Sequence, residues 1–269
     1  MAKKLEETTG TNALAALGDL GDMITSERPA GSDAVTGAEG ITKDDILLPR
    51  LGIAQKTSPE IDPTSPKKIT GLEFTDLYNS LTKKVYGKGP LYFVILRRED
   101  KPRWIEFNPL EEGGGIKDRN VFAGDPRTEF GPNGEKPLAT MFYDYLILIL
   151  NDLDASDPLT NVVAMSLKSS GIVAAKNLNM LIKQRGSKMI CKGVYELNTG
   201  HDTDKKSGGV YAIYKFNNKG WLKADSAIEK MAIEMYESWK DRDLVIDEEQ
   251  AVDEFDPAKM EPTGATAGM

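Results

Sequence analysis

Six short segments rich in β-branched and aromatic residues run through the middle of the chain, and turn-forming residues separate them. Each has the length and composition of a β-strand. They span residues 91–98, 103–107, 141–150, 161–168, 189–197 and 209–216. The first two flank residues 99–102 and predict a β-hairpin, and an Asp-rich turn joins the third to the fourth. The polar residues 198–208 predict a loop between the last two.

Two further segments carry apolar residues at helical spacing, which predicts one helix after the fourth strand and another after the sixth. In the first helix, Ser169 or Ser170 can cap the N-terminus and Gly186 suits the C-terminal stop. Its apolar face carries Ala174, Leu178, Leu181 and Ile182, and its polar face carries Lys176, Asn179 and Lys183. In the second helix, Ser226 and Glu229 form a capping box. Its apolar face indicates packing on the strands and consists of Ile228, Met231, Ala232, Met235, Tyr236 and Trp239.

The order of these elements predicts a mainly β fold with flanking helices, of the α+β class. A five-stranded barrel with a helix between its third and fourth strands is the OB architecture. We therefore expect an OB-like antiparallel β-barrel with one additional strand over residues 41–240. Residues 1–40, rich in Gly, Ala, Thr and Ser, predict a flexible N-terminal arm, and residues 241–269 predict a disordered acidic tail.

Charge is distributed unevenly along the chain. Residues 41–225 hold 27 Lys and Arg against 23 Asp and Glu, residues 226–269 hold 4 against 12, and residues 1–40 hold 3 against 7. A mildly basic body with acidic ends suits a protein that binds a polyanion and keeps its tail for other proteins. A plain solubilising role for the tail is the alternative. The candidate partner-binding residues of the tail are Asp253, Glu254, Phe255 and Asp256.

The residues needed for most kinds of active site are scarce. The single Cys191 and single His201 exclude an intramolecular disulfide and a Cys/His zinc site within one chain. No phosphate-binding glycine motif occurs, and the turn at residues 151–157 lacks the Gly and Glu of a calcium loop. We expect no cofactor, no metal and no enzyme activity. The longest apolar run, residues 146–150, is far shorter than a membrane span, and a signal peptide is not evident, so the sequence predicts a soluble, cytoplasmic protein.

Basic and aromatic residues are interleaved on the predicted strands and around the end of the first helix. Single-strand-binding proteins need both types, because cations track the phosphates and flat rings stack on bases. The candidate DNA-binding residues are Arg97, Arg98, Arg103, Trp104, Lys168, Lys183, Arg185, Lys188, Lys192, Tyr211, Lys215 and Trp221. For the strand aromatics, packing in the core is the alternative to stacking on DNA.

A succession of short segments adds a resemblance to a known family. The segments are Leu48-Pro49-Arg50-Leu51-Gly52-Ile53-Ala54-Gln55 with Ser58-Pro59-Glu60, Asn79-Ser80-Leu81-Thr82, Tyr86-Gly87-Lys88-Gly89, Trp104-Ile105-Glu106-Phe107-Asn108-Pro109 and Gly113-Gly114-Gly115. Over residues 45–220 the chain resembles replication-associated proteins of tailed bacteriophages, and the resemblance implies single-stranded-DNA binding. The acidic tail is similar to the partner-docking tails of bacterial single-strand-binding proteins, although Phe255 stands 14 residues from the C-terminus rather than at the tip.

Together these features predict a phage single-stranded-DNA-binding protein that coats replication or recombination intermediates in the infected host cell. Replication or recombination proteins would dock on its acidic tail. Two alternatives remain open: a non-enzymatic virion or assembly protein, and a strand-annealing recombinase. The lack of paired catalytic carboxylates and histidines disfavours a nuclease.

Overall fold

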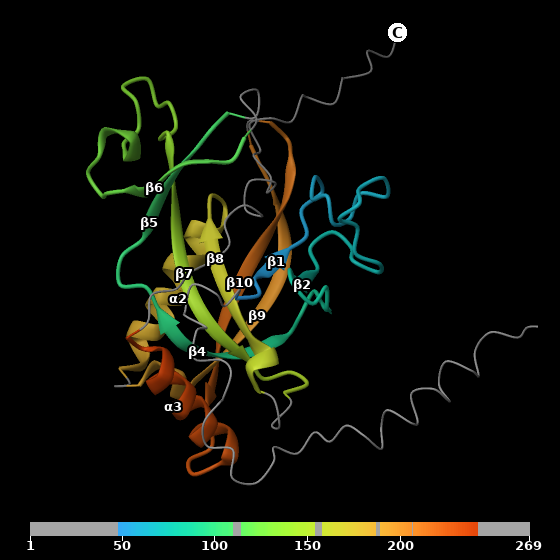
Figure 1. The fold of residues 1–269 in the computed structure, drawn as a ribbon, viewed down its shortest axis with the longest axis vertical. Coiled ribbons are helices and arrows are strands. Elements are labelled where there is room, and N and C mark those ends of the chain that lie inside the picture. The colour runs from blue at the N-terminus through green and yellow to red at the C-terminus, as the bar shows by residue number, and fades with distance from the viewer. Residues whose placement is uncertain (1–47, 110–113, 154–157, 187–188, 206, 242–269) are drawn as a thin grey trace, which may run out of the picture. The chain divides into compact units, whose positions relative to one another are not determined.

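The computed structural model describes residues 48–109, 114–153, 158–186, 189–205 and 207–241 (Figure 1). The predicted N-terminal arm and the predicted tail from residue 242 onward lie outside these residues. The strands are β1 (Leu51–Ile53), β2 (Leu77–Asn79), β3 (Val85–Gly87), β4 (Leu91–Arg98), β5 (Arg103–Phe107), β6 (Ile116–Val121), β7 (Ala139–Ile149), β8 (Val162–Lys168), β9 (Gly193–Thr203) and β10 (Val210–Trp221). The helices are α2 (Gly171–Arg185) and α3 (Ala227–Trp239), and the short 3-10 helices are η3 (Pro126–Thr128), η4 (Pro158–Asn161) and η5 (Ile190–Lys192).

The long strand β7 organises the main sheet. The sheet has seven antiparallel strands. Six follow the order β10-β9-β4-β7-β5-β6, and the seventh, β8, pairs with β7. Tyr145 of β7 lies opposite Met165 of β8 on one edge and opposite Arg98 of β4 on the other. The predicted connection between the third and fourth segments is thus confirmed as the β7–β8 hairpin.

The predicted hairpin of β4 with β5 is wrong, although both strands have the expected bounds. Both pair with β7, since Arg98 lies opposite Tyr145 and Arg103 lies opposite Phe142. The chain therefore does not reverse at residues 99–102 but continues along the same edge of β7. The amide of Glu99 still donates to the carbonyl of Asp144 at 3.1 Å, which holds the connecting residues beside β7.

The β9–β10 hairpin is longer than the sequence predicts. Of residues 189–192, expected to begin a strand, Ile190–Lys192 form η5 instead, while β9 continues through the expected loop to Thr203. Residues 198–203 pair with residues 210–215, so these polar segments form a two-stranded ribbon that is stabilised by the hydrogen bonds between the strands. The reversal is confined to the turn at Asp204, whose carbonyl accepts from the amide of Gly208 at 2.8 Å.

The sheet is open, so the predicted OB-like barrel is not confirmed. Among the described strands, no ladder joins β10 to β6 or to β8. The expected α+β class and the antiparallel arrangement are confirmed. A second sheet, in the order β1-β2-β3, supplies Leu51 and Leu77 to the main core. Gln55, just after β1, bonds both the amide and the carbonyl of Ala212, which shields part of the β10 edge.

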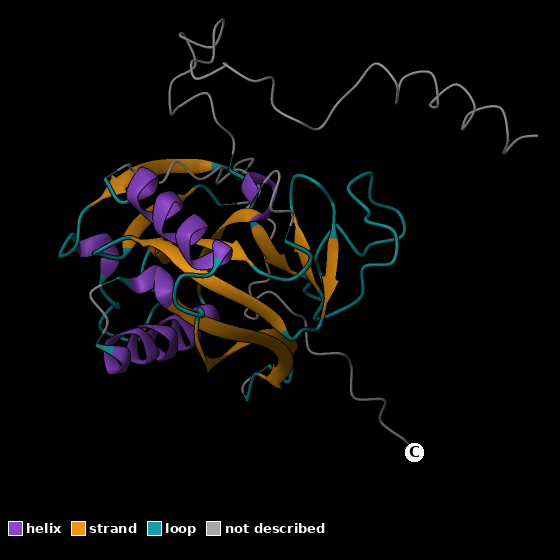
Figure 2. Ribbon diagram, turned by 90° about the horizontal axis from the view of Figure 1, so that it is seen from below, coloured by secondary structure: helices purple, strands orange, loops and turns teal. Residues whose placement is uncertain are grey.

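The two faces of the sheet pack against different helices (Figure 2). Tyr145 and Ile147 of β7 belong to a cluster that includes Leu178 of α2, whereas Leu146 and Leu148 belong to a cluster that includes Ala232 of α3. Because both faces are covered, the second half of β7, residues 145–149, is a continuous apolar run rather than an alternating one. Within the described part of the chain, no helix has the length and apolar character needed to cross a membrane.

Both helices form where the sequence predicts them. Gly186 ends α2 in the left-handed conformation at φ 60°, which glycine adopts without strain. The Ser170 side chain makes no capping hydrogen bond to α2. At α3, the Ser226 hydroxyl accepts from the Glu229 amide at 3.2 Å, while the Glu229 carboxylate accepts from the amide of Asp225 at 2.7 Å. Ile228, expected on the apolar face of α3, is 41% exposed.

Candidate nucleic-acid interface

The candidate DNA-binding residues do not gather on one surface. Lys188 lies outside the described residues, and so do the four candidate partner-binding residues of the tail, Asp253 to Asp256. The others fall into separate places on the fold: beside α3, around Phe142, on the outer face of the β9–β10 hairpin, and at the end of α2.

Two of the cations beside α3 are used to hold that helix. The guanidinium of Arg97 donates to the carbonyls of Trp239 and Lys240 at 3.1 and 3.0 Å, so it satisfies the C-terminal end of α3. Lys192 pairs with Glu229 at the other end of α3 at 3.0 Å. Both interactions link residues distant in sequence, and they give these cations a structural role that sequence spacing does not reveal.

One of the two cations around Phe142, Arg103, pairs with a buried carboxylate. Asp144 is 2% exposed, and its carboxylate accepts from the Ser166 hydroxyl at 2.6 Å and from Arg103 Nε at 2.9 Å. Arg103 and Lys168 also lie 5.5 and 5.7 Å from the centre of the Phe142 ring. Trp104, next to Arg103, is half-buried in β5 between β6 and β7. Much of the positive charge here is balanced within the fold.

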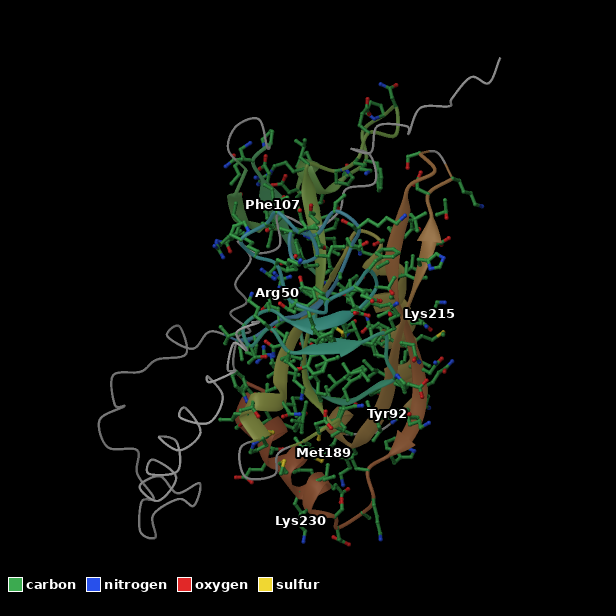
Figure 3. All side chains as sticks on the ribbon, turned by 90° about the vertical axis from the view of Figure 1, so that its right-hand side faces the viewer. Arg50, Tyr92, Phe107, Met189, Lys215 and Lys230 are labelled. Atoms are coloured by element: carbon green, nitrogen blue, oxygen red, sulfur yellow. The ribbon has the colours of Figure 1, made fainter. Side chains whose placement is uncertain are left out.

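Tyr211 and Lys215 lie on what we call the outer hairpin face, the side of β9–β10 turned away from α2. Alternation along β10 sets this direction, because Ala212 and Phe216 point into the core shared with α2. This face also carries Tyr92, Glu196, Asp202 and Lys219. Figure 3 labels Tyr92 and Lys215. Two lysines are thus accompanied by two carboxylates.

The lysine side chains of the outer hairpin face lie against other residues of the protein. Lys219 lies 3.5 Å from the Glu196 carboxylate and 5.2 Å from the centre of the Tyr92 ring. The Lys215 side chain lies over Gly200, where a Cβ atom would meet its Nζ at 2.8 Å. Interaction with Tyr92 and Glu196 raises the pKa of Lys219 above its ordinary value.

The exposed side of α2 has a different composition. Its exposed residues recur at helical spacing and form what we call the α2 face: Val173, Lys176, Met180, Lys183 and Gln184. No Asp or Glu occurs in α2. The surrounding sequence extends this bias, since residues 158–195 contain six Lys and Arg and no Asp or Glu. Sequence reasoning found the lysines near the end of the helix but missed the length of this carboxylate-free stretch, which a sliding count of charge would have found.

An aromatic stack adjoins the C-terminal end of the α2 face. The Arg185 guanidinium lies 4.5 Å from the centre of the Tyr195 ring and 4.8 Å from that of Trp221. It also donates to the carbonyl of Val194 at 2.7 Å and to the Asn218 side chain. Burial lowers the pKa of Arg185 below its ordinary value. The aromatic rings therefore replace part of the water that would solvate this cation.

The Trp221 side chain remains available to a ligand. The residue is 54% exposed, although it contacts Arg185 on one side. Gly193, opposite Trp221 in the β9–β10 ladder, makes room for this arrangement, since a Cβ there would collide with the Arg185 guanidinium. The structure thus brings Lys183, Arg185 and Trp221 of the candidate list to one region.

The sequence comparison identifies a phage family. The family described as Pam3 phage gp34-like protein matches residues 24–244. The chain belongs to this family. The match includes every strand and helix described above. The phage part of the resemblance is confirmed, whereas DNA binding is not part of the family's description and stays a prediction. No curated protein and no solved structure matches the chain.

Proposed function

We propose that this phage protein binds single-stranded DNA through the α2 face and Trp221. The observation that carries the proposal is that the exposed Trp221 of β10 contacts Arg185 at the C-terminal end of α2. This helix has three cations and no carboxylate. Lys176 and Lys183 supply charge for the phosphates, and the exposed part of Trp221 supplies a surface for a base.

The same features favour single strands over duplex. A base can stack on Trp221 only when it is unpaired, and a stacked base contributes about 1–3 kcal/mol regardless of its identity. The two lysines of the α2 face are attracted to phosphates, which are the same in every sequence. Binding is therefore electrostatic and weakly dependent on sequence, which suits a protein that coats replication or recombination intermediates.

A titration of the full chain with single-stranded and duplex oligonucleotides of equal length tests this proposal. We expect tighter binding to the single strand, quenching of tryptophan fluorescence, and a slope of log affinity against log salt of about −0.7 per phosphate contacted. Equal affinity for the duplex, or an affinity that ignores salt, would contradict the proposal.

A non-enzymatic assembly role is the second candidate, because a separate surface exposes large apolar side chains. Phe122, Phe130 and Leu138 are 66, 71 and 70% exposed, and all three belong to the connection between β6 and β7. Three large exposed apolar side chains within one connecting segment favour a protein–protein contact there.

The segment that carries these apolar residues is anchored to the sheet by one arginine. Arg127 pairs with Glu106 at 2.8 Å, with Asp118 at 2.9 Å and with Asp125 at 2.8 Å. Hydrogen bonds from Arg127 lower the pKa of Asp125 to about 2. Light scattering on the wild type and on Phe130→Ser, with Val173→Ser as a control, tests the role. Concentration-dependent oligomers that only Phe130→Ser weakens would support it, and a monomer at all concentrations would count against self-assembly.

A further inference from the structure

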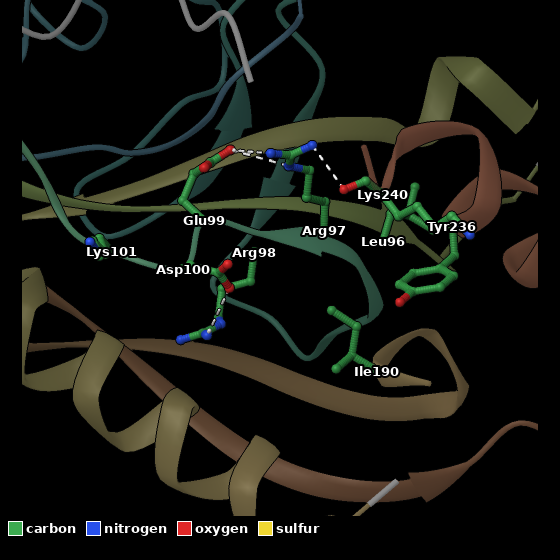
Figure 4. Close-up of a pocket in the computed structure, with 9 residues that line it drawn as sticks. All are labelled: Leu96, Arg97, Arg98, Glu99, Asp100, Lys101, Ile190, Tyr236 and Lys240. Atoms are coloured by element: carbon green, nitrogen blue, oxygen red, sulfur yellow. Dashed lines mark hydrogen bonds and ion pairs between the residues drawn. The ribbon is translucent and has the colours of Figure 1, made fainter. Parts of the chain in front are cut away.

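A pocket of about 500 Å³ lies beside the junction of β4 and β5 (Figure 4). Its position follows from the strand pairing. β9 pairs with β4 only as far as Val94, and β6 pairs with β5 from Trp104 onward, so neither strand covers the edge between them. The lining residues are Leu96, Arg97, Arg98, Glu99, Asp100, Lys101, Ile190, Tyr236 and Lys240.

A register shift in β4 shapes one wall of this pocket. The β4–β7 register shifts between Ile95 and Arg97, which brings both Leu96 and Arg97 to the side of α3. Arg97 is then fixed by Glu99 and by the C-terminal carbonyls of α3. Leu96 forms an apolar wall with Ile190 of η5 and Tyr236 of α3.

The rim of the pocket carries positive charge that the fold balances only weakly. Arg98 has one described ion pair, 3.7 Å from an Asp100 side chain that is 98% exposed. Lys101 is exposed and forms no ion pair with any described residue. The carboxylate of Glu99, by contrast, is neutralised by Arg97 at 3.2 Å. An apolar wall with cations at its rim fits a peptide that combines an aromatic ring with carboxylates.

We propose that this pocket binds the segment Asp253-Glu254-Phe255-Asp256 of the same chain. Phe255 packs against Leu96, Ile190 and Tyr236, and the flanking carboxylates pair with Arg98 and Lys101. This site shares no residue with the α2 face, so the proposal does not depend on DNA binding.

The position and length of the chain support an intramolecular contact. The pocket includes Lys240, and residues 242–252, eleven in number, separate Asp241 from Asp253. Eleven residues can extend about 36 Å at about 3.3 Å each, which is ample for a return to a pocket that begins next to Asp241. A tether of this length gives the segment an effective concentration in the millimolar range. A peptide of modest affinity would therefore occupy the pocket in its own chain.

Disulfide trapping in the full chain tests this contact. The Asp100→Cys, Ala258→Cys double variant, which keeps Phe255, Arg98 and Lys101, should form an intramolecular disulfide under mild oxidation about tenfold faster than an Asp202→Cys, Ala258→Cys control pair, because docking raises the local thiol concentration. Asp100 and Asp202 are both exposed, and Asp202 lies near the end of β9, away from the pocket lining. Native Cys191 does not interfere, since burial raises its pKa to about 11.

Two further experiments, a competing peptide and a mixture of single variants, distinguish docking within one chain from chance collision and from docking between copies. A synthetic peptide of residues 250–259 should slow trapping, whereas the same peptide with Phe255→Ala should not. Equal rates for the two Cys pairs would overturn the proposal. A disulfide that forms just as fast between mixed Asp100→Cys and Ala258→Cys single variants would also overturn it, since the segment would then act between copies.

Discussion

The α2 face and the outer hairpin face both place lysines near aromatic rings, yet they differ in their carboxylates. Lys219 lies beside Glu196 and the Tyr92 ring, and Asp202 shares the same face. Lys176 and Lys183 have no carboxylate on their own helix. Opposite charges on one face largely cancel at a distance, so of these two faces we expect the α2 face to be the one that attracts a polyanion.

The aromatic rings of the two surfaces also differ in what they offer. Trp221 lies against Arg185, is 54% exposed and stands at the end of a strand. Tyr92 is half-buried and covered by Lys219. A count of lysines and aromatics does not distinguish these surfaces. The identity of the nearest neighbour of each side chain does, and this is a property of the fold.

Charge reversal should produce the largest difference in single-strand affinity between variants of the two surfaces. We expect Lys176→Glu with Lys183→Glu to weaken single-strand binding roughly 100-fold at low salt, because two phosphate contacts become repulsions. The matched variant on the outer hairpin face, Lys215→Glu with Lys219→Glu, should change affinity less than about threefold. Filter binding at several salt concentrations measures both. Equal losses would show that the two faces contribute alike.

Removal of the tryptophan side chain should have the next largest effect. Trp221→Ala should weaken single-strand binding about tenfold, within the range of about 1–3 kcal/mol for a stacked base, and leave the melting temperature nearly unchanged because the ring is exposed. Tyr211→Ala on the outer hairpin face is the control. Calorimetric titration measures the affinity of each variant for the single strand, and thermal unfolding measures its melting temperature. A large fall in melting temperature would mean that Trp221 serves the fold instead.

Local sequence patterns predict the elements of this fold better than their partners. The helix stop at Gly186 and the capping box at Ser226 depend on adjacent residues, and both helices form where expected. The predicted β4–β5 hairpin fails because residues 99–102 have the composition of a turn, whereas the pairing is decided by β7, about 40 residues away. Buried apolar strands do not encode which neighbour they join.

In the candidate site, too, features of adjacent residues could be predicted from the sequence, whereas contacts between distant elements could not. The lysines near the end of α2 could be recognised from the sequence, and so could the carboxylate-free residues 158–195. The structural role of Arg97 could not, because its acceptors are the carbonyls of Trp239 and Lys240 at the end of another element. The stack of Tyr195, Arg185 and Trp221 likewise requires three elements to meet.

A smaller effect should follow from Gly193→Ala, which sharpens the role of Arg185. A Cβ at residue 193 would collide with the guanidinium, which is the mobile end of a long side chain. We therefore expect Arg185 to leave the Tyr195 and Trp221 rings and single-strand affinity to fall about threefold, with little loss of stability. Fluorescence anisotropy of the tryptophans and an affinity measurement would detect the change. Unaltered anisotropy and affinity would mean that the stack does not position Trp221.

The smallest effect should come from giving the outer hairpin face the composition of the α2 face. Hydrogen bonding from Asn198 is the main cause that lowers the pKa of Glu196, so this carboxylate stays ionised at neutral pH and must be removed by mutation. Glu196→Gln with Asp202→Asn would leave Lys215 and Lys219 without a carboxylate on their face. We expect single-strand affinity to rise about twofold and the salt slope to steepen, since the freed lysines reach phosphates that pass nearby. Glu234→Gln with Glu237→Gln on α3, which also removes two negative charges, controls for the change in net charge. A gain shared by this control would attribute the effect to net charge, and no gain would show that neighbouring carboxylates are not what keeps the outer hairpin face from DNA.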